Sequence, residues 1–154
     1  MTFILGLDPS AEKSISDTGY AWGQFSKDKP LEILDAGVIH GGFEGFVKQV
    51  HLYGEFQSHL LSADIVVCEK FVTWEPRADS TPRLLEGVVR FLRPDAVMQP
   101  ASGKNSLVPD SFLKAQGLWK SKGSHHNDDR ESVRHLYFFL AKNKHIPTLK
   151  QLSE

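Results

Sequence analysis

The stretch Phe3-Ile4-Leu5-Gly6-Leu7-Asp8-Pro9-Ser10 places a short apolar run directly before a single carboxylate. The run is too short for a stable helix and contains Gly6, so it predicts a central β-strand. Pro9 has no backbone N–H to donate to a sheet and is expected to end the strand after Asp8. A carboxylate at the end of an apolar strand is costly unless it is paired or bound to a metal ion. An Asp that caps a turn is the alternative that this stretch leaves open.

Length and composition predict a single domain over residues 1–154. The chain has 154 residues, 40% of them apolar, which is enough to bury one core. Cys68 is the only cysteine and lies in an apolar run, so we expect a buried, inert thiol. No apolar segment approaches the length of a membrane helix, and residues 1–23 lack a signal-peptide pattern. We therefore expect a cytoplasmic protein without a membrane partner.

Charge is divided unevenly along the chain, although the net charge is only −1. Residues 1–99 hold 9 Lys or Arg against 14 Asp or Glu, whereas residues 100–154 hold 9 against 5. The basic part of the chain is suited to facing the phosphates of a nucleic acid. An ordinary solvated surface explains the same charges.

Two more strands and a helix are expected after the first strand. Alternating residues predict strands at 18–25 and 31–38, joined by a turn at 27–30, so the first three strands should form an antiparallel meander. Apolar residues at helical spacing then predict one amphipathic helix over 42–61, weakened at Gly54.

A second apolar run, Ala63 to Cys68, ends in the carboxylate of Glu69. A strand that is reached through a helical crossover normally lies parallel to its neighbour, so the carboxyl ends of the two strands meet at one edge of the sheet. We therefore expect Asp8 and Glu69 to face each other across adjacent strands. Two adjacent carboxylates repel each other unless a proton or a cation lies between them.

The remaining elements alternate between helix and strand. The pattern predicts a helix over 83–92, a short strand over 95–100, a short helix over 110–116, and a last helix that begins at Asn127 or Asp128 and runs to 144. The helix over 83–92 is expected to bury an apolar stripe of Leu84, Leu85, Val88, Val89 and Leu92.

Asp129 lies at the start of the last helix, on its apolar side. Steps of four, three and four residues lead from Asp129 to Val133, Leu136 and Leu140, so the spacing places Asp129 on the core-facing stripe. Acids near a helix start also serve as caps and interact with the helix dipole, which is the alternative for Asp128 and Asp129.

The order of these elements, and the three places where acids occur, resemble a known family. The chain resembles the RuvC-type Holliday-junction resolvases of the RNase H-like superfamily, in particular the short forms of bacteriophages. The resemblance extends over about residues 3–140. The segments that carry it are 4–10 with 18–20, Cys68-Glu69-Lys70-Phe71 and His126-Asn127-Asp128-Asp129, and segments 78–81 and 84–87 add to it.

This resemblance implies a fold and an activity. The implied fold is α/β and RNase H-like: a five-stranded mixed sheet, with strands 1–3 antiparallel and strands 4–5 parallel to strand 1, flanked by helices. The implied activity is that of a metal-dependent endonuclease, which resolves four-way junctions and other branched DNA in recombination and repair. Two alternatives stay open: a broader nuclease that cuts flaps and forks, and a junction-binding protein without catalytic activity.

The resemblance also implies an active site. Asp8 and Glu69 correspond to the family's first two acids, and two ligands spaced three apart belong on the last helix. His126 with Asp129 fits that spacing, as does Asp128 with Glu131. We favour His126 with Asp129, because Asp129 shares the apolar stripe and Glu131 is expected to point elsewhere. Asp128 is kept as a possible ligand.

Two Mg²⁺ or Mn²⁺ ions are the expected cofactors. Both are hard cations that prefer carboxylate oxygen, and a pair of ions about 4 Å apart can activate a water molecule and neutralise the leaving oxygen of a phosphodiester. His126 would bind the second ion or position the attacking water. A zinc site would need more His and Cys ligands than converge in this pattern.

Contacts with DNA are expected around this site. Phe71 and Trp74 are predicted to stack on bases opened at the junction, with anchoring of their loop as the alternative. Lys104, Lys120 and Lys122 are predicted phosphate contacts, with Lys104 nearest to the scissile bond and solvated lysines as the alternative.

A homodimer is expected, because resolvases of this family cut two symmetric strands of a four-way junction. The helix over 43–61 or the helix over 83–92 would form the contact between the two copies. An actin-like sugar kinase or ATPase also begins with a strand, an Asp and a hairpin, but it needs a second domain that 154 residues cannot hold.

Overall fold

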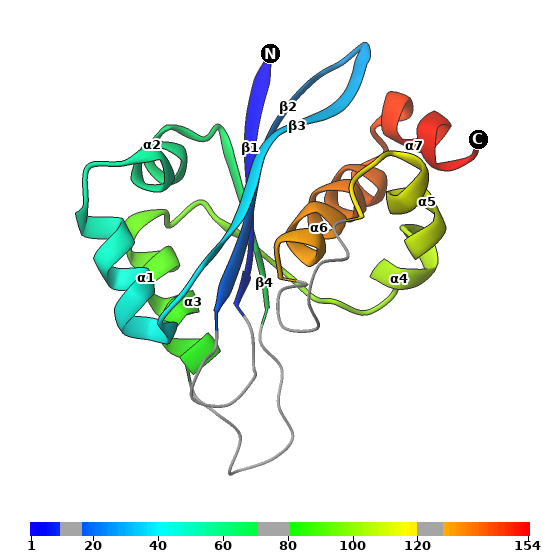
Figure 1. Cartoon of the computed structure of the whole chain (residues 1–154). Helices are drawn as coiled ribbons and strands as arrows, with labels where there is room; N and C mark the ends of the chain where they lie inside the picture. The colour runs from blue at the N-terminus through cyan, green and yellow to red at the C-terminus, as the bar shows by residue number, and fades with distance from the viewer. Residues whose placement is uncertain (10–16, 71–80, 120–127) are drawn as a thin grey trace.

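A five-stranded mixed sheet forms the centre of the molecule (Figure 1). The computed structural model describes residues 1–9, 17–70, 81–119 and 128–154, and for residues 81, 82, 128 and 129 it describes the backbone alone. The strand order is β3-β2-β1-β4-β5. The first three strands pair antiparallel, and β4 and β5 run parallel to β1, as the sequence predicts. The strands are β1 (Thr2–Pro9), β2 (Thr18–Ser26), β3 (Lys29–Ile39), β4 (Ile65–Glu69) and β5 (Val97–Gln99).

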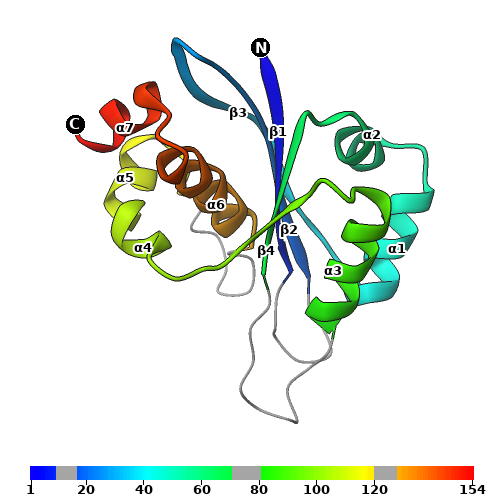
Figure 2. The same ribbon diagram turned by 180° about the vertical axis from the view of Figure 1, so that it is seen from behind.

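Helices cover both faces of this sheet (Figures 1 and 2). One face carries α1 (Gly42–His51), α2 (Glu55–Ser62) and α3 (Thr81–Leu92). The other face carries α4 (Lys104–Leu107), α5 (Asp110–Ala115), α6 (Asp128–Lys142) and α7 (Ile146–Leu152). Helix α6 packs directly across β1, β2 and β3, so its first turns lie over the central strand. In the described parts of the chain, none of the helices has the length and apolarity that spanning a membrane requires.

Successive side chains of β1 point alternately into two hydrophobic cores, one on each face of the sheet. Leu5 and Leu7 pack into the core under α1, α2 and α3, whereas Ile4 packs into the core under α5 and α6. Strand β4 alternates in the same way, with Cys68 in the first core and Val67 in the second. Since successive side chains of a strand point to opposite faces, the last acid of each strand belongs to the α6 face. The Cys68 thiol is fully buried, and this burial raises its pKa, as expected for an inert thiol.

Several local predictions are wrong. The single helix expected over 42–61 is two helices, because the backbone is extended at Leu52 and again at Gly54, and Tyr53 between them is fully exposed. Strand β1 runs through Pro9 instead of ending at Asp8. Leu84, expected in the buried stripe of α3, is half exposed, while Leu85 and Val89 of that stripe are buried.

Two short helices, α4 and α7, have no counterpart in the sequence prediction. Helix α4 is a single turn with no buried residue, so it carries no apolar periodicity. Helix α7 is seven residues long, has a proline in its first turn and buries only Thr148. Amphipathic spacing cannot reveal such elements, because their positions depend on the helices and strands around them.

Gly6 allows α6 to approach the sheet closely. A methyl group at Gly6 would lie 2.9 Å from the backbone oxygen of Ser132 and 2.9 Å from a methyl carbon of Leu136. We expect Gly6→Ala to lower the free energy of unfolding by about 1–3 kcal/mol, the usual cost of overpacking a core. Urea denaturation measures this change.

Gly87 provides the matched control for this prediction. It lies inside α3, where an added methyl group would meet no atom of the described residues within 4 Å. Gly87→Ala should raise the free energy of unfolding by about 0.5–1 kcal/mol, because alanine favours a helix interior over glycine. Equal effects of the two substitutions would show that α6 does not rest on β1 at Gly6.

Candidate active site

A row of polar side chains crosses the carboxyl edge of the sheet on the α6 face. Asp8 ends the apolar part of β1, Glu69 ends β4, and Gln99 ends β5. Leu7 is paired with Cys68 and Glu69 is paired with Gln99, so the three polar residues lie side by side on adjacent strands. The structure thus brings together the two acids at the ends of the first and fourth strands.

His135 of α6 completes this group. Its side chain is fully buried, and its Nε2 atom lies 3.4 Å from Oε2 of Glu69. Ligand atoms of Asp8, Glu69 and His135 all lie within 4.8 Å of one another. The sequence analysis missed His135, because it sits between a buried arginine and a core leucine and follows no motif. The only signal is its position seven residues, or two helical turns, after Asp128.

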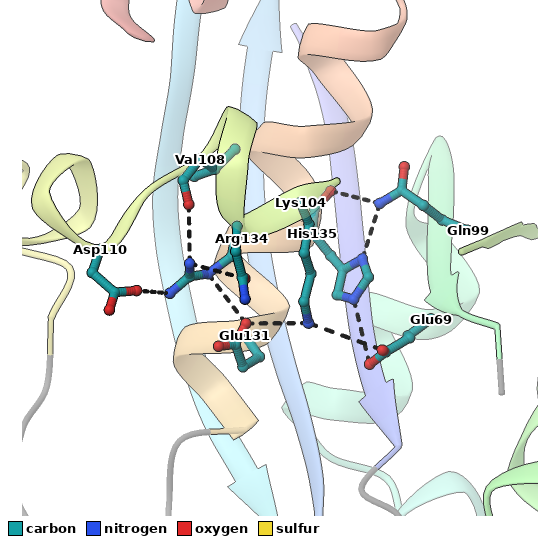
Figure 3. A network of polar contacts seen from close by, with 9 residues as sticks. Glu69, Gln99, Lys104, Val108, Asp110, Glu131, Arg134 and His135 are labelled. Atoms are coloured by element: carbon teal, nitrogen blue, oxygen red, sulfur yellow. Dashed lines mark hydrogen bonds and ion pairs between the residues drawn. The ribbon is translucent and has the colours of Figure 1, made fainter. Parts of the chain in front are cut away.

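Gln99 connects β5 to His135 (Figure 3). Its amide nitrogen Nε2 lies 3.0 Å from Nδ1 of His135 and 3.0 Å from the backbone carbonyl oxygen of the same residue. Both side chains are buried, so these contacts are shielded from water. The imidazole is therefore held between Gln99 on one side and Glu69 on the other.

Lys104 approaches the same carboxylate from α4. Its Nζ atom lies 3.9 Å from Oε1 of Glu69 and 3.3 Å from Oε2 of Glu131. Gly103, with a φ of 87°, adopts the left-handed conformation and starts the turn that carries Lys104. The expectation that Glu131 points elsewhere is wrong, because Glu131 lies one helical turn before His135 and shares the ion-pair network of Glu69.

Arg134 ties the α4–α5 segment to α6. Its guanidinium is almost completely buried and donates to the side-chain oxygen of Asn105 at 3.1 Å and to the carbonyl oxygen of Val108 at 3.0 Å. It also forms ion pairs with Asp110 and Glu131. The hydrogen bond from Arg134 holds the pKa of Asp110 below its usual value. The position of Lys104 thus depends on a buried arginine of the neighbouring helix.

Several neighbouring groups shift the pKa of Glu69. Burial acts to raise the pKa of Glu69, but the polar groups of His135 and Asp8 beside it, together with the nearby charge of Lys104, lower it to about 2. Ligand atoms of Asp8 and Glu69 lie within 4.8 Å of each other, and two adjacent carboxylates repel each other unless a proton or a cation lies between them. Asp8 is itself buried, so ionising both groups without such a cation is costly.

The donor set of this site fits a hard divalent cation. Asp8 and Glu69 offer carboxylate oxygens, the preferred ligands of Mg²⁺ and Mn²⁺ in proteins. Of the proposed ligands on the last helix, Asp128 and Asp129 form the first turn of α6, four and three residues before Ser132, whose carbonyl oxygen faces Gly6. This turn therefore starts near the carboxyl end of β1. The other residues predicted to contact metal or DNA lie outside the described residues: His126, Phe71, Trp74, Lys120 and Lys122.

The sheet order and the helices on its two faces define an RNase H-like α/β fold. Its three antiparallel strands are followed by two strands parallel to the first, and the acids lie where the parallel strands end.

Two solved structures of a RuvC protein share this fold. One is T. thermophilus RuvC in complex with a Holliday junction substrate: it is 12% identical, the match covers 92% of this chain and 96% of that chain, and the TM-score is 0.63. The other is the Thermus thermophilus RuvC structure, also 12% identical, with 93% and 97% of the two chains covered and a TM-score of 0.59. No family model and no curated protein matches this chain. At this level of identity the similarity shows the fold.

Proposed function

We propose that this protein is a metal-dependent endonuclease that resolves Holliday junctions and other branched DNA, acting as a single RNase H-like domain in the cytoplasm. The observation that carries this proposal is the pairing of Asp8 and Glu69 at the carboxyl edge of the sheet, on the fold of a protein solved with a Holliday junction. A bacteriophage origin, with the host cytoplasm as its location, stays a prediction of the resemblance.

The predicted site residues would divide the work of such a site. Asp8 and Glu69 would hold Mg²⁺ or Mn²⁺, and the start of α6 would supply the remaining ligands, either His126 with Asp129 or Asp128 with Glu131. The second pair gains support from Lys104, which lies 3.3 Å from Glu131 and 3.9 Å from Glu69. Two bound ions would activate a water molecule and neutralise the leaving oxygen of the phosphodiester. Lys104, only 14% exposed and beside Glu69, is placed to attract a phosphate oxygen to the scissile position. Phe71, Trp74, Lys120 and Lys122 stay predicted DNA contacts.

A cleavage assay tests this proposal. The purified protein is incubated with a fixed four-way junction, a replication fork and a linear duplex of the same sequence, with Mg²⁺, with Mn²⁺ or with EDTA. We expect metal-dependent nicking of the four-way junction and little cleavage of the linear duplex. Equal cleavage of all three DNAs would indicate a broader nuclease. Tight junction binding without cleavage in either metal would indicate a junction-binding protein and contradict the proposal.

We also propose that the protein is a homodimer whose two copies meet at α3. This helix exposes two large apolar side chains, Leu84 and Phe91, which lie seven residues apart and therefore on one side of the helix. Phe91 is 84% exposed and Leu84 is 50% exposed. Of the two helical regions expected to form the contact, we choose α3, because its two exposed apolar residues lie on one side of a continuous helix, whereas the exposed Leu52 and Tyr53 lie in the break between α1 and α2.

Phe91→Glu should convert this dimer into monomers, because it places a charge in the middle of the apolar contact. Sedimentation velocity should give twice the chain mass of 17.3 kDa for the native protein and 17.3 kDa for the variant. Leu61→Glu is the matched control, since Leu61 is 57% exposed and lies on α2 instead of α3. A native protein that sediments as a monomer at micromolar concentration would contradict the dimer.

A further inference from the structure

We infer that His135 is a positioning residue: Gln99 selects the tautomer in which Nε2 of His135 carries the hydrogen. This nitrogen is buried, makes no hydrogen bond to the described residues and faces Oε2 of Glu69 at 3.4 Å. In this role His135 is not a ligand of the metal ion. The inference concerns the metal centre of the proposed nuclease and in that respect rests on the proposed function. Its structural part, the orientation of Gln99 and of the imidazole, stands on the geometry of the described residues alone.

The orientation of the Gln99 amide is determined by a backbone group. Gln99 Nε2 lies 3.0 Å from the carbonyl oxygen of His135, and a carbonyl oxygen can only accept a hydrogen bond. The amide must therefore present its NH₂ group, and not its oxygen, to α6. With the amide reversed, two oxygen atoms would face each other in a buried site, at a high cost in desolvation.

This orientation determines the tautomer of His135. The same NH₂ group of Gln99 lies 3.0 Å from Nδ1 of His135, so one of its two hydrogens is available to that atom. Nδ1 must then accept, and a neutral imidazole carries its single hydrogen on the other nitrogen, Nε2. That nitrogen lies 3.4 Å from Oε2 of Glu69. A hydrogen on Nε2 occupies the direction in which a metal ion would have to bind.

Each of the two carboxylate oxygens of Glu69 therefore has an N–H group beside it. One oxygen of Glu69 faces Nε2 of His135, and the other faces Nζ of Lys104 at 3.9 Å. Both neighbours are donors, and both come from outside the sheet. The plane of the carboxylate is thereby set before any metal ion arrives, which is how residues around metal ligands commonly contribute to affinity.

Nitrogen-15 NMR of the histidine rings tests the tautomer in the metal-free protein. We expect His135 to show a protonated Nε2 and an unprotonated Nδ1, and to keep this pattern when Mg²⁺ is added. Gln99→Met, which preserves length but removes the donor, should reduce the preference for this tautomer. A native ring protonated on Nδ1 or on both nitrogens, or loss of the Nε2 hydrogen on adding Mg²⁺, would overturn the inference.

Metal affinity tests the role of the donor. His135→Phe should weaken Mg²⁺ binding, measured by calorimetry, by about 10–100-fold. His135→Gln places an amide N–H near the position of Nε2 and should restore affinity to within about threefold of the native protein. His51→Phe, at an exposed position on α1, is the control and should leave the affinity unchanged.

These measurements separate the inference from the proposed function. If His135→Gln binds Mg²⁺ as poorly as His135→Phe while both retain native circular dichroism, the donor role is wrong, whatever the nuclease activity. If the native protein shows the expected tautomer and metal affinities but cuts no branched DNA, the proposed function fails and the positioning role stands. Where His135→Phe does not fold, the comparison of Gln99→Met with the native protein decides the tautomer.

Discussion

Asp8→Asn should lower the rate of junction cleavage by about 1000-fold while leaving junction binding almost unchanged. Asparagine has nearly the shape of aspartate but lacks the negative charge that would hold a divalent cation beside Glu69. Metal ions contribute several kcal/mol to the stabilisation of charge in phosphoryl transfer, and about 4 kcal/mol corresponds to a factor of about 1000 in rate. Binding of the junction should persist, because removing a carboxylate also removes a group that repels phosphate. Single-turnover cleavage and gel-shift measurements on the same junction report the two quantities separately.

Glu69→Gln should have an effect of the same size, for the same reason. It also removes the charge that Lys104 and His135 face, so a modest loss of stability is expected beside the loss of cleavage. Asp95→Asn is the control: Asp95 is exposed and paired with Arg93 beyond the end of α3, and its substitution should leave cleavage unaltered. Normal cleavage by both the Asp8 and the Glu69 variants would defeat the nuclease proposal.

Arg134→Met should lower the free energy of unfolding by about 1–3 kcal/mol, the usual cost of leaving a buried hydrogen-bonding group without its partner. Methionine keeps much of the volume, but it leaves the carbonyl oxygen of Val108 and the side chain of Asn105 without their donor. The α4–α5 segment then loses its anchor on α6, so Lys104 should also lose its fixed position beside Glu69. Urea denaturation of the variant measures the change in stability.

The same substitution at an exposed arginine gives the comparison for Arg134. Arg90 of α3 is 57% exposed and pairs only with Glu86 one turn away among the contacts of the described residues. Arg90→Met should change the free energy of unfolding by less than about 1 kcal/mol, because exposed pairs contribute little. A loss at Arg134 no larger than the loss at Arg90 would show that the α4–α5 segment is held by its apolar contacts alone.

The sheet and its acidic edge are predictable because their signals are local. The apolar run before Asp8 and the one before Glu69 each define a strand, and a helical crossover between them makes the strands parallel. From these two facts the carboxyl ends must meet, which is where the structure places the two acids. The apolar stripe of the last helix through Val133 and Leu136 is equally local, and both side chains are buried as expected.

The break in the helix over 42–61 shows where local patterns stop being sufficient. Phe46 and Leu60 both follow helical spacing and both reach the same core, but the chain unwinds between them and leaves Tyr53 fully exposed. Helical spacing indicates which residues are buried. It does not show whether they belong to one helix or to two. The packing of α1 and α2 on the sheet decides this.

By itself, the amino-acid sequence determined the antiparallel meander of the first three strands and the position of Asp8 and Glu69 at one edge, because apolar runs, turns and a helical crossover are visible as local patterns. Only the tertiary structure decided that His135, Gln99, Lys104 and Glu131 gather around Glu69. His135 and Gln99 are 36 residues apart in the chain, and their contact depends on how far α6 is shifted along β5 and β4. Side-chain packing across the whole core sets that shift, including the close approach of α6 at Gly6.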